Sequence, residues 1–137
     1  MSLQDCGQII IRLLFASLFG ALIGWERQIK DKSAGLRTHI LVSLGSALFI
    51  LVPILLSPNS SDVNAISRAI QGITTGIGFL GAGEIWRDAQ TATKKPPIHG
   101  LTSAAAIWVV ARLGIAAGVG LWQLGLIGTT IVLIVLR

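Results

Sequence analysis

The sequence has few charged residues and a single cysteine. Only 12% of its 137 residues are Asp, Glu, Lys or Arg, about half the share usual in soluble domains, whereas 53% are hydrophobic. So little polar surface argues against a water-soluble domain. Cys6 alone permits neither an intramolecular disulfide nor a cysteine metal site. The net charge is +5, but the basic residues are scattered between long apolar runs, which does not fit a nucleic-acid-binding face.

No Asp or Glu follows Asp88, and this absence decides how the glycines at 76, 78 and 81 are interpreted. Their spacing matches the glycine fingerprint of a dinucleotide-binding turn. That turn requires a β-strand before the glycines and a carboxylate about 20 residues after them. The sequence KPPIHG lies at that distance, and no β-branched run precedes Gly76. We therefore interpret these glycines as part of a membrane helix.

Five apolar segments approach the roughly 20 residues that a membrane-spanning helix needs. Glycines at 118 and 120 separate the last two. The predicted fold is therefore all-α and integral to the membrane, with five transmembrane helices in a single domain over residues 1–137. The five segments are residues 8–25, 38–56, 65–83, 98–118 and 121–136.

Most of the basic residues lie in the first and third connections, which predicts that both connections face the cytoplasm. The N-terminus is then outside, and the C-terminus at Arg137 is cytoplasmic. The N-terminal residues lack the basic start of a signal peptide, so we expect the first apolar run to be retained as a helix.

Three arginines lie inside predicted helices, where an ionisable group marks a partner or a site by default. Arg12, Arg68 and Arg112 all fall toward the outer half of the bilayer. We expect Arg112, which is the deepest, to pair inside the bundle. Arg68 either reaches the outer interface by snorkelling or contributes to a site. One hypothesis is an outward-facing cationic pocket for a phosphate-bearing lipid or another anion.

The first cytoplasmic connection holds the densest set of polar residues. Glu26 and Arg27 end the first helix, and Arg37, Thr38 and His39 begin the second. We expect Arg37 to reach back to Glu26 as an interfacial ion pair, which would give a structured cytoplasmic face. The alternative is that these residues only anchor the helix ends.

No metal site, cofactor or catalytic group is predicted. His39 and His99 lack the spacing of a ligand pair. Glu84 and Asp88, one helical turn apart, are more typical of a solvated face than of a hydrated cation site. An enzyme acting on lipids is a third option, but no nucleophile lies beside a base.

Small residues recur at four-residue spacing, which is typical of close helix packing in lipid. The third helix carries glycines on several sides, so we expect it at the centre of the bundle. The expected packing positions are Ala16, Gly20, Gly24, Gly72, Gly100 and Ala104.

Four stretches, GALIGWERQ, AGLRTHILVSLGSALF, GIGFLGAGEI and HGLTSAAAIW, occur in this order over roughly residues 12–120. Together they resemble the MgtC/SapB family of bacterial inner-membrane proteins. The resemblance implies a five-helix membrane domain with a role in growth under magnesium limitation and, in intracellular pathogens, in survival inside host cells. Some relatives look like regulators of other membrane proteins, ion-motive ATPases among them. The family's motif positions carry over as Gly20, Gly24, Glu26, Arg27, Gly35, Arg37, Thr38, Gly76, Gly78, Gly81, Gly83, Gly100, Leu101, Thr102 and Trp108, with Ser103 where a Thr is common.

Many members of that family continue into a soluble cytoplasmic domain, whereas this sequence stops at Arg137. We therefore expect a transmembrane domain without that C-terminal part, either as a short member or as a truncated one.

We expect a non-enzymatic protein of the bacterial inner membrane that contacts membrane lipids and regulates another membrane protein under magnesium limitation or ionic stress. The alternative is an ion channel or transporter whose path is lined by the intramembrane arginines and Gln71. Five helices leave little room for a pore, so that version requires a homo-oligomer. The expected functional residues are Glu26, Arg27, Arg37, Thr38, Arg68, Gly76, Gly78, Gly81, Gly83 and Arg112.

Overall fold

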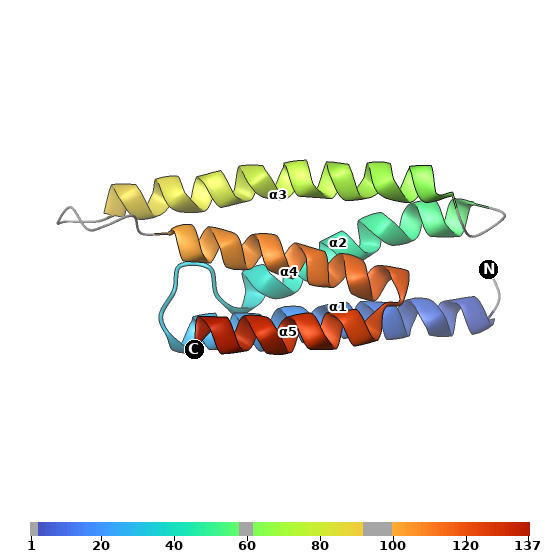
Figure 1. The fold of residues 1–137 in the computed structure, drawn as a ribbon, viewed down its shortest axis with the longest axis horizontal. Helices are drawn as coiled ribbons and strands as arrows, with labels where there is room; N and C mark the ends of the chain where they lie inside the picture. Colours follow the sequence, from blue (N-terminus) through green and yellow to red (C-terminus); the bar gives the residue numbers. More distant parts are fainter. Residues whose placement is uncertain (1–2, 58–61, 92–99) are drawn as a thin grey trace.

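The computed structural model describes residues 3–57, 62–91 and 100–137 as five α-helices that run side by side along the long axis (Figure 1). Successive helices alternate in direction. The N-terminus lies at the end where α2 finishes, and the C-terminus lies at the opposite end, where α1 finishes and α2 begins. The helices are α1 (Leu3–Ile29), α2 (Leu36–Leu56), α3 (Val63–Thr91), α4 (Leu101–Val119) and α5 (Trp122–Leu136).

The all-α fold with five helices agrees with the prediction, and so does the break between the last two. Gly120 ends α4 with φ +88°, a left-handed conformation that glycine adopts without strain. The backbone N–H groups of Gly120 and Leu121 donate to the carbonyls of Ala117 and Ala116. These bonds satisfy two of the last carbonyls of α4, and α5 then begins at Trp122.

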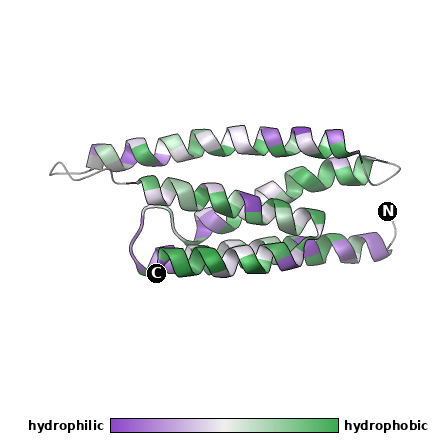
Figure 2. Cartoon of the chain, in the orientation of Figure 1, coloured by the Kyte–Doolittle hydropathy of each residue, from purple (hydrophilic) through white to green (hydrophobic). Residues whose placement is uncertain are grey.

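Three of the described helices, α1, α2 and α4, are long and apolar enough to cross a membrane. The fifth helix, α5, is strongly apolar but has only 15 residues. In contrast, α3 has 29 residues but a lower hydrophobicity, because glycine, threonine and polar residues interrupt its apolar ones. Figure 2 shows hydrophobic residues along the length of α5 and hydrophilic ones at the N-terminal end of α1 and in the α1–α2 connection.

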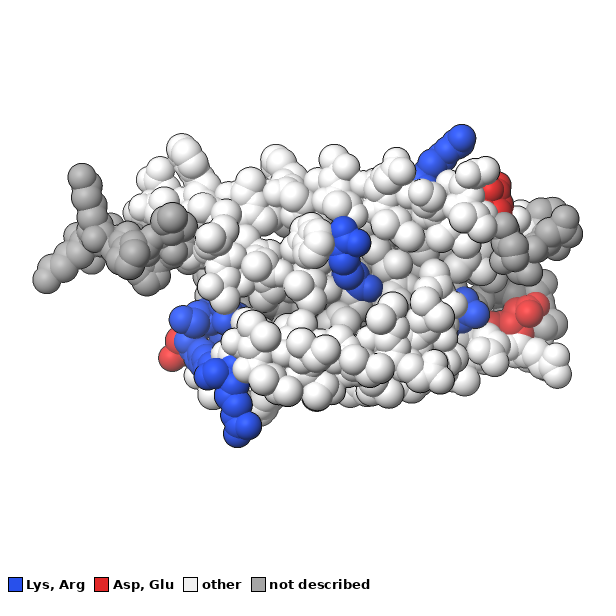
Figure 3. Space-filling view, viewed as in Figure 1, with Lys and Arg blue, Asp and Glu red and all other residues white. Residues whose placement is uncertain are grey.

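Large apolar side chains cover the outer surface. Phe79 is 82% exposed, Phe49 70%, Ile134 69% and Leu41 67%. Monomeric soluble proteins rarely expose broad apolar patches of this kind. On the face shown in Figure 3, the charged side chains lie mainly toward the two ends of the molecule. This distribution fits a surface in contact with lipid.

The centre of the bundle is α4 rather than α3. Within the described residues α4 packs against each of the other four helices, whereas α3 packs against α2 and α4 alone. The prediction of a central α3 is therefore wrong. The helix is peripheral because most of its glycines face open space and not a neighbouring helix. A Cβ at Gly72, Gly76, Gly78 or Gly83 would meet no described atom within 4 Å.

The closest helix approaches involve glycines of α1 and α4, both against α2. A Cβ at Gly20 would lie 2.6 Å from the carbonyl oxygen of His39, and one at Gly24 would lie 2.8 Å from Cα of Leu36. Gly114 faces the backbone of Ser43 in the same way. Glycine is required there because any side chain would separate the helices.

Of the other predicted packing positions, Ala16 is fully buried in the core and Ala104 faces Gly81 of α3. Gly100 lies just before α4 as its N-cap, with φ +86°. It therefore shapes the start of the helix and is not a packing residue inside it.

Candidate functional site

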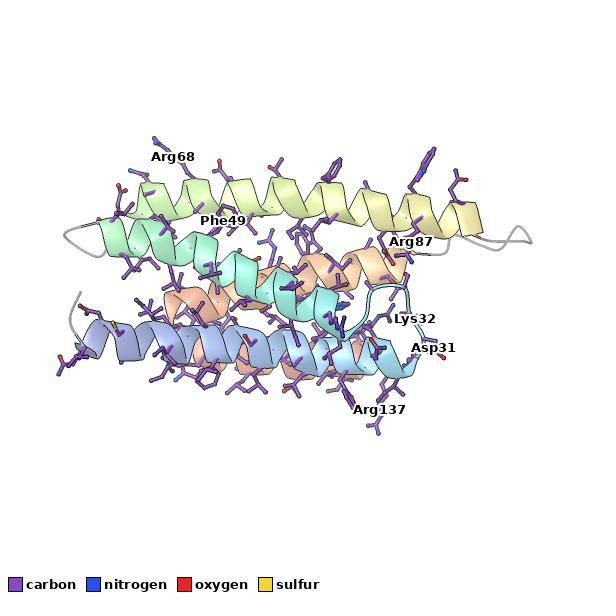
Figure 4. All side chains as sticks on the ribbon, turned by 180° about the vertical axis from the view of Figure 1, so that it is seen from behind. Asp31, Lys32, Phe49, Arg68, Arg87 and Arg137 are labelled. Atoms are coloured by element: carbon purple, nitrogen blue, oxygen red, sulfur yellow. The ribbon has the colours of Figure 1, made fainter. Side chains whose placement is uncertain are left out.

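Polar side chains gather at the end of the bundle where α1, α3 and α5 finish and where α2 and α4 begin. We call this group the polar end cluster. Figure 4 shows that the labelled Asp31, Lys32, Arg87 and Arg137 lie at the same end. The members of the cluster are Glu26, Arg27, Lys30, Ser33, His39, Glu84 and Ser103.

Arg27 is the most deeply buried charged residue of the cluster, with only 3% of its surface exposed. Its Nη2 donates to Oγ of Ser103 at 2.8 Å, which links the last turn of α1 to the first turn of α4. Its Nη1 lies 4.0 Å from Oε2 of Glu26. A buried arginine needs such partners, because an unpaired charge away from water is strongly unfavourable.

Glu26 pairs with a residue that the sequence analysis did not select. Its Oε1 lies 2.7 Å from Nζ of Lys30, one helical turn further along α1. The same Nζ donates to the carbonyl oxygen of Leu136 at 2.6 Å and so binds the C-terminal end of α5. The expected partner Arg37 is exposed instead. Arg37 lies at the start of α2, where it lines a surface depression together with Gln28 and Thr38.

The connection between α1 and α2 is fixed by side-chain hydrogen bonds. Oε1 of Gln28 accepts from the backbone N–H of Leu36 at 3.2 Å. Ser33 donates to Glu84, which ties the connection to α3. Nδ1 of His39 lies 2.8 Å from the carbonyl oxygen of Gly35, to which its N–H can donate. The connection is therefore a structured surface that spans three helices.

Some polar atoms in and beside the cluster are buried without a hydrogen-bond partner among the described residues. Among them are Nε of Arg27, Nε2 of His39 and Oγ of Ser43; the carboxylate oxygens of Glu26 are also buried and interact with the charges of Lys30 and Arg27. A buried polar group without a partner costs about 1–3 kcal/mol. Such atoms retain unused hydrogen-bonding capacity for a water molecule or for another polar group.

The three arginines inside helices make separate contacts and do not line a common pocket. Nη1 of Arg12 donates to the carbonyl oxygen of Gly118 at 2.9 Å. Arg68 is exposed, and Figure 4 shows it pointing away from the bundle. The guanidinium of Arg112 stacks on the ring of Trp108, with Cζ 4.1 Å from the ring centroid. Arg112 is exposed, so the expectation of a partner inside the bundle is wrong.

An apolar groove of about 630 Å³ lies between α2 and α3. Gly45 of α2 and Gly72 and Gly76 of α3 line it, together with the exposed ring of Phe49. The hydroxyl of Ser46 also lines the groove but donates to the carbonyl of Val42 in its own helix. The groove therefore offers packing space and no free polar group for an ion. Of the other predicted glycines, Gly81 faces Ala104, while Gly78 and Gly83 face open space.

Sequence reasoning overlooked Lys30 and the role of Ser103. The spacing of Glu26 and Lys30 at i and i+4 could have revealed their pairing. The partnership of Arg27 and Ser103 could not be found this way, because 76 positions separate them. His99 and the side chain of Asp88, which were considered for a metal site, lie outside what the structure describes. Within the described part, no three His, Cys, Asp or Glu side chains form a group suited to a metal ion.

Comparison with known proteins identifies the family. Residues 13–137 match the model of the MgtC family. The chain belongs to this family. The resemblance inferred from the four sequence stretches is thereby confirmed.

Relatives in the MgtC family come from several bacteria. The chain is 51% identical to Protein SrpB of Synechococcus elongatus, over 91% of this chain and 71% of the relative. It is 40% identical to the putative magnesium transporter YhiD of Escherichia coli, over 95% of this chain and 60% of the relative. It is 43% identical to Protein MgtC of Salmonella typhimurium, over 90% of this chain and 49% of the relative.

The chain thus spans about half of MgtC and three fifths of YhiD. None of these names denotes an enzyme. No solved structure matches the chain. Membership of this family, together with the apolar helices, establishes a membrane protein.

Proposed function

We propose that this protein is a non-enzymatic component of the bacterial inner membrane that supports growth under magnesium limitation or ionic stress by regulating another membrane protein. An ion-motive ATPase is the kind of partner that we expect. Magnesium is suggested by one relative, whose name describes a putative magnesium transporter. Regulation by contact, instead of transport by the chain itself, is suggested by the packing of the bundle.

The observation that carries this proposal is the apolar packing around α4. The buried residues along α4 are almost all aliphatic or small, such as Val110, Ala111, Leu113 and Ala117. The buried hydroxyls of Ser46 and Thr129 donate to a carbonyl one turn back in their own helix, and Oγ of Ser43 is an isolated buried hydroxyl without a partner among the described residues. Within the described residues, no row of free polar groups crosses a single copy. A magnesium ion, which gives up its water reluctantly, would find no ligands along such a path.

Five membrane crossings are the arrangement that we favour. With 29 residues, α3 is about 43 Å long, and α5 with 15 residues is about 22 Å long. The longer helix exceeds the thickness of the hydrocarbon layer, while α5 is shorter and requires local thinning of the bilayer. Lys30, Lys32, Arg37 and Arg137 lie at one end, and we place that end in the cytoplasm with the N-terminus outside.

The alternative function is an ion channel or transporter formed by several copies. Gln71, Arg68 and Arg112 are exposed on the outside of the single copy. Any path that they line must therefore lie between copies. This version requires a homo-oligomer in which these three residues face one another.

Two measurements test the proposal. Cells that lack the protein are expected to grow more slowly at low magnesium and to recover when the intact chain is supplied. Normal growth of such cells at low magnesium would refute the proposed role.

The second measurement is ion flux into liposomes that contain only the purified protein. We expect the flux to equal that of empty liposomes. Selective, protein-dependent flux would refute the regulatory role and support the alternative, an ion channel or transporter formed by several copies.

A further inference from the structure

The exposed side of α4 carries a charge halfway along its length. Arg112 is the only Asp, Glu, Lys or Arg in this helix. Its side chain is exposed. Apart from Thr102 in the first turn, the exposed residues of α4 recur at helical spacing, so they form one stripe. We call these residues the α4 stripe: Leu101, Ala105, Trp108 and Arg112.

The flanks of the α4 stripe are two helices that do not touch each other. Figure 1 shows α4 between α3 and α5, and in the described part of the chain α3 and α5 make no contact. Ala105 is the smallest member of the stripe, so a neighbouring helix can approach α4 closely there. The stripe is therefore open along its length to another helix in the membrane.

Arg112 is held away from the nearer end of α4. Its Cα lies about 10 Å from the C-terminal end of α4 and about 16 Å from the N-terminal end. The guanidinium does not extend toward the nearer end. It stacks on Trp108, one turn back toward the N-terminus, with Cζ 4.1 Å from the ring centroid. The charge consequently lies close to the midpoint of α4, away from both ends of the helix.

Among the residues that the structure describes, no carboxylate lies at that depth. Glu84 accepts a hydrogen bond from Ser33, which places it at the level of the α1–α2 connection. The other acidic residues lie at helix ends or in connections. A second copy of these residues in the same orientation therefore cannot neutralise Arg112 at mid-depth. The six acidic residues are Asp5, Glu26, Asp31, Asp62, Glu84 and Asp88.

We propose that the α4 stripe docks a membrane-spanning helix of a different protein, one that carries a single Asp or Glu near the middle of the bilayer and pairs it with Arg112. This inference rests on the proposed regulation of another membrane protein and names the chemistry of that partner. The guanidinium presents a planar fork of donors that matches a carboxylate, and the ion pair is strong where water is excluded. Trp108 fixes the orientation of the fork before the partner arrives.

The first test uses a synthetic partner. A polyleucine helix with one central Asp is labelled for energy transfer and added to the purified protein in phosphatidylcholine vesicles. Matched peptides carry Asn or Leu at the centre, or Asp near one end. We expect the central Asp helix to associate about tenfold more tightly than the central Leu helix. Equal association of the Asp, Asn and Leu helices would overturn the proposal.

Protein variants identify the residue responsible. Arg112→Leu is expected to remove the preference for Asp, whereas Arg112→Lys retains the charge and part of the preference. Arg68→Leu is the matched control, because Arg68 is also an exposed helix arginine but lies near the start of α3. Arg112→Leu replaces an exposed side chain, and its helix content is checked by circular dichroism. A preference that survives in Arg112→Leu would refute the assignment.

Phosphatidylglycerol distinguishes a helix from a lipid phosphate. Replacing a third of the phosphatidylcholine by this anionic lipid is expected to leave the preference for the Asp helix unchanged. If the anionic lipid abolishes the preference, Arg112 binds lipid phosphate and the proposed helix partner is wrong.

The second test is made in cells. A photo-crosslinking amino acid at Ala105 should capture a membrane protein with an Asp or Glu in the middle of a spanning helix, and capture should disappear in Arg112→Leu. Reversing both charges, with Arg112→Glu and an Arg in place of the partner's acid, should restore capture. Capture only of a second copy, or of a protein without such an acid, would overturn the inference. The growth assay of cells that lack the whole chain tests the proposed function separately, because the peptide assay does not depend on it.

Discussion

Nη2 of Arg27 and Oγ of Ser103 form a hydrogen bond of 2.8 Å that joins the last turn of α1 to the first turn of α4. Both residues are almost completely buried, with 3% and 4% of their surface exposed. Because α4 packs against all the other helices, this single bond ties the central helix to the structured connection between α1 and α2. The polar end cluster therefore depends on the alignment of α1 with α4.

Ser103→Ala should lower the free energy of unfolding by about 1–3 kcal/mol, because it leaves the buried guanidinium without its partner on α4. Ser46→Ala is the matched control, since Ser46 is equally buried but donates to Val42 in its own helix. Its effect should be clearly smaller. Denaturant titration of the protein in mixed detergent micelles measures both values. Equal losses for the two variants would show that the bond to Arg27 contributes no stability of its own.

Substitution by alanine should distinguish glycines that lie in helix contacts from glycines that face open space. Gly20→Ala places a methyl group 2.6 Å from the carbonyl oxygen of His39, so α1 and α2 must move apart at a cost of about 1–3 kcal/mol. Gly78→Ala meets no described atom within 4 Å, so it should be neutral or stabilise α3 by up to about 1 kcal/mol. Thermal unfolding in detergent compares the two variants. Destabilisation by Gly78→Ala would indicate a contact on α3 that the single copy does not show.

Two glycines, Gly20 and Gly72, show which parts of the fold the sequence could predict. Long apolar segments and the pair of glycines before α5 were sufficient for the number of helices, because hydrophobic length and backbone breaks are local properties. The role of a glycine face is not local. Gly20 and Gly72 each belong to a four-residue repeat of small residues, but only Gly20 faces another backbone. Sequence spacing shows that a close approach is permitted, and it does not show which helix provides the partner.

In the candidate site, too, the sequence could predict contacts within one helix but not contacts between helices. Glu26 and Lys30 lie one turn apart in one helix, so their pairing follows from helical geometry. Pairing between Glu26 and Arg37 required the path of the connection, which turns in a way that leaves Arg37 exposed. The position of Arg112 depended on the rotation of α4 about its axis. The pattern of α4 is apolar on nearly all sides, so the sequence contained little information about that rotation.

Gly120→Ala should destabilise the corner between α4 and α5. The residue has φ +88°, and a side chain in this region costs roughly 1–2 kcal/mol. Gly45→Ala is the control, since it lies within α2 and has no described atom within 4 Å of the added methyl group. Its stability should stay within about 1 kcal/mol of the parent chain. Unfolding in mixed micelles measures both changes. Equal stability of Gly120→Ala and the parent would contradict the left-handed corner.

The five-crossing orientation predicts which residues can be labelled from outside the cell. In a Cys6→Ser background, Leu3→Cys should react with a membrane-impermeant maleimide in intact cells, because Leu3 is 93% exposed at the outer end of α1. Lys32→Cys and Arg137→Cys should react only after the membrane is permeabilised, since both residues are exposed at the opposite end of the bundle. Labelling of Arg137→Cys from outside would mean that α5 does not cross the bilayer. Labelling of Lys32→Cys in intact cells, with Leu3→Cys protected, would reverse the whole orientation, because every helix alternates in direction with its neighbour in the chain.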